Sequence, residues 1–421
     1  MKFGLLSYNY TTNLGNEIQS IAARRFLPQI DHYIEHEKLE RFKDSENVKV
    51  IMNAWYLDCP TAWPPSENID PLLVSMHFTT RQKLRKEAIL TEKSREFFER
   101  HGPVGCRDHH TVDFLSENDI DAYYTGCLTL TLDSGKKGFK SDEEYIVVNV
   151  ANPDELVSYL KGKTDRKIYF IYQDMIPSYD KAFPETTTGG IYTLTSLYDC
   201  REKFFMAENL LRIYENASCV ITDRIHCALP CLAFEVPVLF LESDRMPERL
   251  NGIRELFNRT TLDEYFRNFS IFDVENPHEN PKDYLKIRKD LIDKCREFTG
   301  CVNDSCYTDI TSQDLLDRNS LILSKNAYES RAYMREILKR YKNEMNLHDE
   351  SRHAIEMQNE KIRKLNDELN NKNRAISDLN SEIADANSRI DDLKSEIDAL
   401  NGKIDEITST STWKLHSKFR K

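Results

Sequence analysis

Two apolar runs joined by a polar elbow and an apolar helix constrain the fold of this chain most. Residues 219–222 and 236–241 have the length and apolar character of buried strands, with a helix predicted between them. Strand, helix and strand in this order are typical of a parallel α/β sheet, where ligands bind at strand-to-helix elbows. The elbow carries Arg224 and His226, and free N–H groups at a helix start attract anions. We therefore expect a small, negatively charged substrate at this elbow.

The same alternation of strands and helices extends over most of the chain and predicts its fold class. Buried strands are predicted over residues 2–8, 48–54, 72–76, 103–106, 145–150, 167–172 and 191–194, and the run over 236–241 is the last clear strand. Helices are predicted over residues 17–26, 91–101, 111–117 and 201–214, with Asn16 and Gln19 capping the first of them. The pattern predicts two doubly wound, Rossmann-like α/β domains with a binding site in the cleft between them.

The composition divides the chain into five expected segments. An N-terminal α/β domain over residues 1–138 precedes a C-terminal α/β domain over 139–300, which carries the Arg/His elbow. A helical connector over 301–343 leads to a coiled coil over 344–409 and a basic tail over 410–421. The tail contains Trp413 and no acidic residue, so it could rest on an anionic membrane surface. A disordered chain end is the alternative.

A heptad repeat identifies the predicted coiled coil. Apolar side chains recur at steps of three and four over about seven heptads. They are Ile355, Ile362, Leu365, Leu369, Ile376, Leu379, Ile383, Ala386, Ile390, Leu393, Ile397, Leu400, Ile404 and Ile407. Isoleucine dominates position a and leucine dominates position d, which favours a parallel dimer, and Lys372 at a d position can fix the register. The alternative is a single solvated helix.

Charge and composition exclude several classes of protein. A formal net charge of −12 argues against a nucleic-acid partner. The chain has no apolar run of about 18 residues that would span a membrane and no signal-like N-terminus, so we expect a cytoplasmic protein, or one at the inner face of the membrane. The ten cysteines lack zinc spacing, so we expect reduced thiols and no metal site. No glycine-rich dinucleotide or P-loop motif is present.

Two further polar stretches follow predicted strands. Arg107 and Asp108 come directly after residues 103–106, and the loop at 11–16 follows the first strand. An arginine at such an elbow can hold an anion, and a histidine such as His226 can move a proton near neutral pH. The structural alternatives are an ion pair of Asp223 and Arg224 with each other or with a neighbour, with His226 capping a carbonyl. At the other elbow, Thr111 or Asp108 could simply cap the following helix.

Together the three stretches resemble the polysaccharide pyruvyl transferase family. Residues 13–16 resemble its N-x-G-D loop, residues 105–111 its G-x-R-D-x-x-T motif, and residues 222–238 its T-x-R-x-H motif with the following G-x-P-V. The resemblance covers about residues 1–270. Two positions depart from the family pattern: Asn16 stands where aspartate is usual, and Glu235 where glycine is usual.

The resemblance implies an activity and roles for these residues. The family transfers pyruvate from phosphoenolpyruvate to two hydroxyls of a sugar in a surface polysaccharide or its precursor, forming a ketal. Its fold is similar to the GT-B arrangement, and phosphoenolpyruvate is a donor substrate rather than a cofactor. The catalytic residues would be His226 and Asp108, and His226 would bind phosphate or supply a proton. The substrate-binding residues would be Arg107, Arg224, Asn13, Gly15, Asn16 and Thr222.

The C-terminal part carries a second resemblance. A long coiled coil ending in Trp413, Lys414 and Leu415 is similar to extensions of bacterial surface-polysaccharide glycosyltransferases, which implies glycan-assembly enzymes as partners. Two other functions remain open. The chain could be a GT-B glycosyltransferase that uses a nucleotide sugar, or an inactive coiled-coil scaffold in glycan assembly.

Overall fold

The computed structural model describes residues 1–8, 11, 13–57, 62–133, 144–151, 153–171, 173, 200–242, 247–301, 325–409, 415 and 418. The chain divides into one compact unit over Met1–Glu350 and a second over Ser351–Lys421. The predicted boundary between residues 138 and 139 lies outside the described residues, so the two-domain division of the first unit stays a prediction.

A four-stranded parallel sheet forms in the N-terminal part of the first unit. Its strands lie in the order β2 (His32–Glu35), β1 (Lys2–Ser7), β3 (Val48–Met52) and β5 (Ile69–Leu73). Strands β1 and β3 are apolar and largely buried, as strands covered on both faces must be, and the sequence predicted both. Strand β2 was missed because only Ile34 in it is buried.

A five-stranded parallel sheet forms in the C-terminal part of the first unit. Its order is β10 (Lys167–Phe170), β9 (Tyr145–Asn149), β11 (Cys219–Thr222), β12 (Val238–Glu242) and β13 (Asn258–Thr261). The expectation that residues 236–241 form the last strand is wrong, because β13 follows. Its polar sequence buries Thr260 and leaves two neighbours exposed, so it carried no strand signal. The strand predicted at 191–194 lies outside the described residues.

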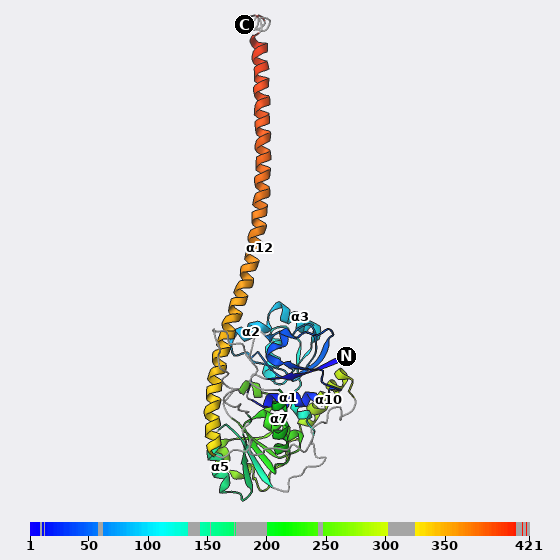
Figure 1. Cartoon of the computed structure of the whole chain (residues 1–421), viewed down its shortest axis with the longest axis vertical. Helices are drawn as coiled ribbons and strands as arrows, with labels where there is room; N and C mark the ends of the chain where they lie inside the picture. Colours follow the sequence, from blue (N-terminus) through cyan, green and yellow to red (C-terminus); the bar gives the residue numbers. More distant parts are fainter. Residues whose placement is uncertain are drawn as a thin grey trace. The chain divides into compact units, whose positions relative to one another are not determined.

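One hydrophobic core connects the two sheets. Leu5 of β1, Val147 of β9 and Leu229 of α8 (Ile225–Ala233) belong to the same buried cluster. Helix α1 (Gly15–Arg24) packs on α7 (Cys200–Glu215), and Figure 1 shows both helices in the middle of this unit. The sheets are therefore joined by apolar packing between segments that lie far apart in the sequence.

The observed N-caps of two helices contradict one predicted cap and confirm another. Helix α1 begins at Gly15, and Leu14 at its N-cap offers no side-chain hydrogen bond, so the predicted capping box of Asn16 with Gln19 is wrong. Helix α4 (His109–Ser116) is capped by Asp108, whose carboxylate accepts a hydrogen bond from the backbone N–H of Thr111. The structural role expected for Asp108 is thus confirmed.

The remaining elements complete the first unit. They are η1 (His36–Arg41), β4 (Trp55–Tyr56), β6 (His77–Phe78), α2 (Lys83–Ile89), α3 (Glu92–His101), β7 (Val104–Cys106), β8 (Ala122–Tyr124), η3 (Leu128–Thr131), α5 (Asp154–Lys161), η4 (Pro247–Leu250), η5 (Arg254–Leu256), α9 (Leu262–Arg267), η6 (Phe269–Ile271) and α10 (Tyr284–Thr299). The pairs β4–β6 and β7–β8 are parallel, so every strand pair in the described part of the chain is parallel.

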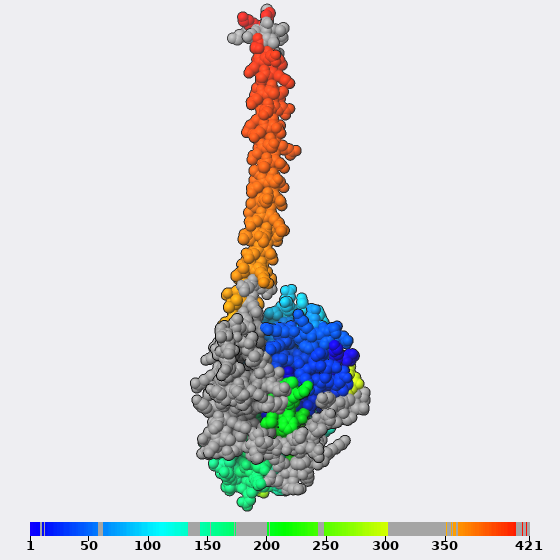
Figure 2. Space-filling model, in the orientation of Figure 1, coloured from blue at the N-terminus to red at the C-terminus, as the bar shows by residue number. Residues whose placement is uncertain are grey.

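The C-terminal part is a single long helix, α12 (Lys325–Ser409). It contains the whole segment predicted as a coiled coil. Its seam residues are exposed, with Ile383 at 57% and Leu400 at 52%, and Figure 2 shows the orange-to-red side chains standing free along the helix. The helix is confirmed, whereas the dimer stays a prediction. Of the predicted basic tail, only Leu415 and Lys418 belong to the described residues.

Two general expectations can be compared with the structure. Among the described residues, no helix combines the length and apolar character needed to cross a lipid bilayer. The expectation that all thiols are reduced is wrong for Cys301, which takes part in a disulfide. Seven other described cysteines are free, and all of them except Cys200 are buried.

Candidate functional site

Charged side chains gather where parallel strands end. Arg107 follows β7, His226 lies in the first turn of α8 after β11, and Arg249 lies in η4 after β12. Arg107 and His226 are buried, Arg249 is half-buried, and the positive charges of Arg107 and Arg249 act on His226. The structure thus brings the elbow at Arg107 and the elbow at Arg224 and His226 together. It adds Arg249, a third arginine beside them. We call Arg107, Arg224, Arg249 and His226 the cationic cluster.

Arg107 is one of the largest fully buried side chains in the protein, with 1% of its surface exposed. Its Nε and Nη2 atoms make no hydrogen bond among the described residues, and Nε lies 3.7 Å from Asp108 Oδ2. Burying a guanidinium without satisfying its donors costs several kcal/mol. A side chain held in this state is poised for an anionic ligand that would take up the free donors.

His226 is a neutral imidazole in the free protein. Burial lowers its pKa well below 6.5, and the charges of Arg107 and Arg249 lower it further. Its Nε2 atom lies 3.9 Å from Cys127 Sγ, at the start of η3. An anion between the arginines would offset their charges and raise the pKa of His226, so ligand binding and protonation of this histidine are coupled.

The other two arginines differ in their surroundings. Burial, followed by the charges of Arg107 and Arg224, lowers the pKa of Arg249 to about 10. Arg224 is one-third exposed, and its Nε lies 3.1 Å from Asp223 Oδ1. The ion pair between Asp223 and Arg224, which was the structural alternative expected from the sequence, therefore forms. Asp223 is itself fixed, since its Oδ2 accepts a hydrogen bond from Ala151 N–H.

Asp108 is fully buried and holds a histidine that the sequence did not single out. Its Oδ2 lies 2.6 Å from His77 Nδ1, and its Oδ1 accepts hydrogen bonds from the backbone N–H and the hydroxyl of Thr111. Burial lowers the pKa of His77 to about 4, although the Asp108 carboxylate raises it. Asp108 thus contacts both Arg107 and His77, and its own side chain is not exposed to solvent.

The N-terminal loop reaches the cationic cluster through its backbone. Asn13 Oδ1 accepts a hydrogen bond from Gly15 N–H. A Cβ atom added at Gly15 would collide with Gln173 Nε2 and lie 3.0 Å from His226 Nδ1. A larger residue would therefore have to displace the Gln173 side chain and would crowd His226. Asn16 is half-buried and donates its N–H to Asn13 O.

A buried ion pair holds this loop in place. Lys203 of α7 lies 2.7 Å from Glu17 of α1, and both side chains are at most 1% exposed. Lys203 also donates hydrogen bonds to the carbonyl oxygens of Tyr8 and Thr11. A helix of the C-terminal half thus fixes the loop that follows β1.

Thr222 shapes the elbow from within. Its hydroxyl donates to Asn149 O at 2.7 Å and accepts from Arg224 N–H at 2.9 Å. The side chain is fully buried. The structure therefore gives Thr222 a structural role, and its predicted substrate contact stays a prediction.

Three residues of the site were missed in the sequence. His77 follows the predicted strand at 72–76 and Arg249 follows that at 236–241, so the strand-end rule that singled out Arg107 applied to both. Lys203 lies in the first turn of α7, far from any strand end, and carried no such signal. No group of three or more metal-ligating side chains occurs among the described residues.

Comparison with solved structures gives two weak likenesses. A protein of Klebsiella pneumoniae described as functionally uncharacterized is 14% identical, with a TM-score of 0.35 over 60% of this chain and 88% of that chain. A UDP-GlcNAc 2-epimerase of Methanocaldococcus jannaschii, solved with UDP-GlcNAc and UDP, is 12% identical, with a TM-score of 0.35 over 70% of this chain and 99% of that chain. Neither likeness carries a conclusion about this chain.

The fold and the site define an α/β protein with buried cations at the carboxyl ends of parallel strands. Residues 74–245 match the family model described as polysaccharide pyruvyl transferase. This segment is therefore similar to that family, a family of transferases, as its motifs indicated. The matched range includes His77, Arg107, Asp108, Arg224 and His226, whereas the loop at 13–16 lies before it. A search of the curated proteins found no match.

Proposed function

We propose that this protein transfers pyruvate from phosphoenolpyruvate to hydroxyls of a sugar, in a surface polysaccharide or its precursor, and forms a pyruvate ketal. The cationic cluster is the observation that carries the proposal. It holds a buried and a half-buried arginine beside a neutral histidine, within or next to the segment that matches the pyruvyl transferase family model. Phosphoenolpyruvate has a phosphate and a carboxylate, which suit several guanidinium donors.

The arginines hold the donor in this proposal. Arg107 offers a fully buried guanidinium group, Arg249 a half-buried one, and Arg224 a partly exposed one. Phosphate and carboxylate each accept paired N–H donors from arginine, so the three side chains can bind both ends of the donor. Backbone groups of the loop that contains Asn13 and Gly15 lie beside His226 and complete the donor site.

His226 then acts on the bound donor. In the free protein it is neutral, so it donates one hydrogen bond to the phosphate. Binding of the anion raises its pKa, which allows it to take up a proton and deliver that proton to the enol carbon as this carbon becomes a methyl group. The cationic cluster thereby couples donor binding to the acid form of His226.

The proposal extends to architecture and assembly. The two parallel sheets suit two doubly wound domains in a GT-B-like arrangement with the donor between them. Helix α12 carries an exposed apolar seam, which suits a parallel coiled-coil dimer. The protein would act in the cytoplasm, or at the inner face of the membrane beside glycan-assembly enzymes.

The direct test is incubation of the full chain with phosphoenolpyruvate and lipid-linked or nucleotide-linked sugars. Phosphate release together with a sugar mass gain of one pyruvate less one water is expected. The melting temperature should rise with phosphoenolpyruvate and stay unchanged with nucleotide sugars. A rise with nucleotide sugars alone would favour a glycosyltransferase, and no response to either ligand would favour a scaffold.

A further inference from the structure

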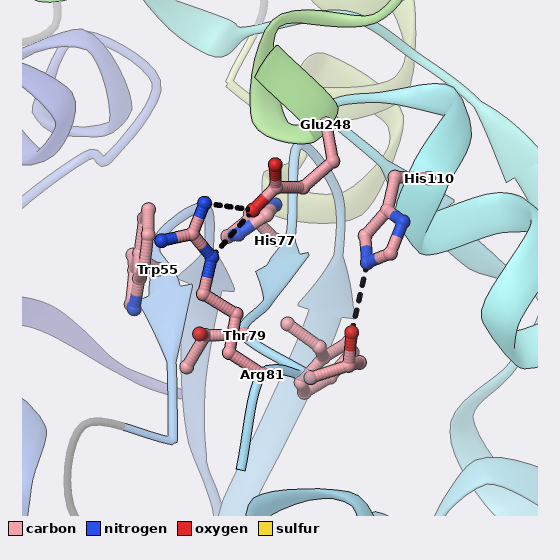
Figure 3. A pocket seen from close by; sticks show the side chains of 8 residues that line it. Trp55, His77, Thr79, Arg81, His110 and Glu248 are labelled. Carbon is pink, nitrogen blue, oxygen red and sulfur yellow. Dashed lines mark hydrogen bonds and ion pairs between the residues drawn. The ribbon is translucent and has the colours of Figure 1, made fainter. Parts of the chain in front are cut away.

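A pocket of about 250 Å³ opens beside the cationic cluster. Figure 3 shows Trp55, His77, Thr79, Arg81, His110 and Glu248 around it. The Thr80 hydroxyl and His110 Nε2 form a hydrogen bond of 2.8 Å, and Arg81 forms an ion pair with Glu248. The volume lies at the small end for ligand pockets, which suits a single sugar ring. Hydroxyl, carboxylate and imidazole groups in one pocket are suitable partners for sugar hydroxyls.

The pocket shares a wall with the cationic cluster. The ring of Trp55 lies 4.4 Å from that of His77 and 5.6 Å from Arg249 Cζ. Glu248 precedes Arg249 in η4, and His77 contacts Asp108, which lies next to Arg107. A ligand in the pocket would therefore be a close neighbour of an anion held by Arg107 and Arg249.

His77 is oriented in this wall by Asp108. The carboxylate binds Nδ1 of the imidazole, which keeps the proton on Nδ1 and leaves Nε2 as the acceptor nitrogen. Nε2 makes no hydrogen bond within the described residues. The hydrogen bonds from Thr111 and the cap of α4 fix the carboxylate in turn. A carboxylate that is held rigidly and itself holds a histidine in one tautomer is the arrangement of a general base.

We propose that this pocket is the acceptor-sugar subsite and that His77 is the base that accepts the proton of the attacking sugar hydroxyl. This inference rests on the proposed function, because it requires a phosphoenolpyruvate-derived electrophile in the cationic cluster. Asp108 is then a positioning residue, which acts through His77, and the hydroxyl enters from the Trp55 side.

Protonation of the enol carbon makes the phosphate-bearing carbon electrophilic, and the sugar oxygen forms a bond to it while its O–H proton passes to His77 Nε2. The C–O bond to phosphate then breaks, and phosphate leaves with the electron pair and with the proton from His77. The second hydroxyl attacks the same carbon, and the proton that it loses replaces the one given to the enol carbon. Two hydroxyl protons are thus consumed, one at the methyl group and one on phosphate.

The charges around His77 suit this task. Burial and the charges of Arg107 and Arg249 favour the neutral imidazole, whereas Asp108 favours the protonated one. The free protein therefore presents a base at neutral pH. The hydroxyl becomes acidic only as its oxygen bonds to the electrophilic carbon, so a weak base suffices, and Asp108 stabilises the imidazolium that forms.

The test compares three full-length variants. His77→Gln removes the base. Asp108→Asn keeps the cap of α4, because asparagine caps as well as aspartate, but its amide N–H₂ would donate to His77 Nδ1 and force the proton onto Nε2. His278→Gln is the matched control, since His278 is exposed and outside the pocket. We expect the first two variants to lose roughly 10²–10⁴-fold in kcat and the control to keep its rate.

Phosphoenolpyruvate affinity is measured for every variant. It should stay within about threefold of the unaltered protein in His77→Gln and His278→Gln, because the cationic cluster is intact. It should not weaken in Asp108→Asn, because this change removes a negative charge beside Arg107. The double variant should be no slower than either single variant, since both remove the same function. If the unaltered protein transfers pyruvate and His77→Gln transfers it equally fast, the inference is wrong. If the unaltered protein neither binds phosphoenolpyruvate nor transfers pyruvate, the proposed function itself fails.

Discussion

At the residue scale, burial of ionisable groups defines this site. The guanidinium groups of the buried Arg107 and the half-buried Arg249 lie beside His77 and His226, which are neutral. The cost of removing charge from water falls on the arginines and favours the neutral form of both histidines. These ionisable groups lower the stability of the free protein, and a bound anion would stabilise them. This pattern is expected of a ligand site rather than of a structural ion-pair network.

The neutral state of His226 predicts how stability depends on pH. Its pKa is lower in the folded protein than the ordinary value of about 6.5 in the unfolded chain, so below pH 6.5 the unfolded chain binds a proton that the folded chain excludes. The free energy of unfolding must therefore fall as pH falls from 7 to 5.5, by about 1 kcal/mol for this residue. His77 contributes with the same sign.

Urea denaturation at the two pH values measures this effect. His226→Gln should lose about 1 kcal/mol less than the unaltered protein between pH 7 and 5.5, whereas His278→Gln should behave like the unaltered protein. An equal loss in both variants and the unaltered protein would mean that His226 is not buried in its neutral form.

At the element scale, the parallel strands place the chemistry. The strand-end rule predicted from the sequence that Arg107, Arg224 and His226 lie at strand-to-helix elbows of two domains and face one site, and the structure brings them together. His77 and Arg249 also follow predicted strands, but they were not singled out because neither belonged to a motif. Lys203 could not be found, because its partner Glu17 is 186 positions away in the sequence and only the tertiary contact pairs them. The start of α1 was misplaced since tight packing, rather than a side-chain cap, decides it.

The exposed seam of α12 predicts self-association. Ile383 occupies an a position and Asp385 a solvated c position of the same heptad. Ile383→Lys would place a charge inside the seam and should weaken the dimer more than tenfold, whereas Asp385→Lys should not. Light scattering of the full chain measures the mass. A monomeric unaltered chain, or equal masses for the two variants, would contradict the coiled coil.

At the scale of the whole molecule, the site depends on segments drawn from most of the first unit. The loop at 13–15, Arg107, His226 and Arg249 come from four distant stretches, and a shared core with the buried pair of Lys203 and Glu17 holds them together. Donor binding should therefore need the intact unit over Met1–Glu350. Helix α12 contributes assembly in this account and adds no residue to the site.

Binding of phosphoenolpyruvate to the cationic cluster is measured directly by calorimetric titration. Arg249→Met is compared with Arg254→Met, which removes an exposed arginine of the neighbouring turn. We predict one phosphoenolpyruvate per chain, an affinity at least tenfold weaker in Arg249→Met, and an unchanged affinity in Arg254→Met. The absence of binding to the unaltered protein, or equal affinities in both variants, would contradict the account.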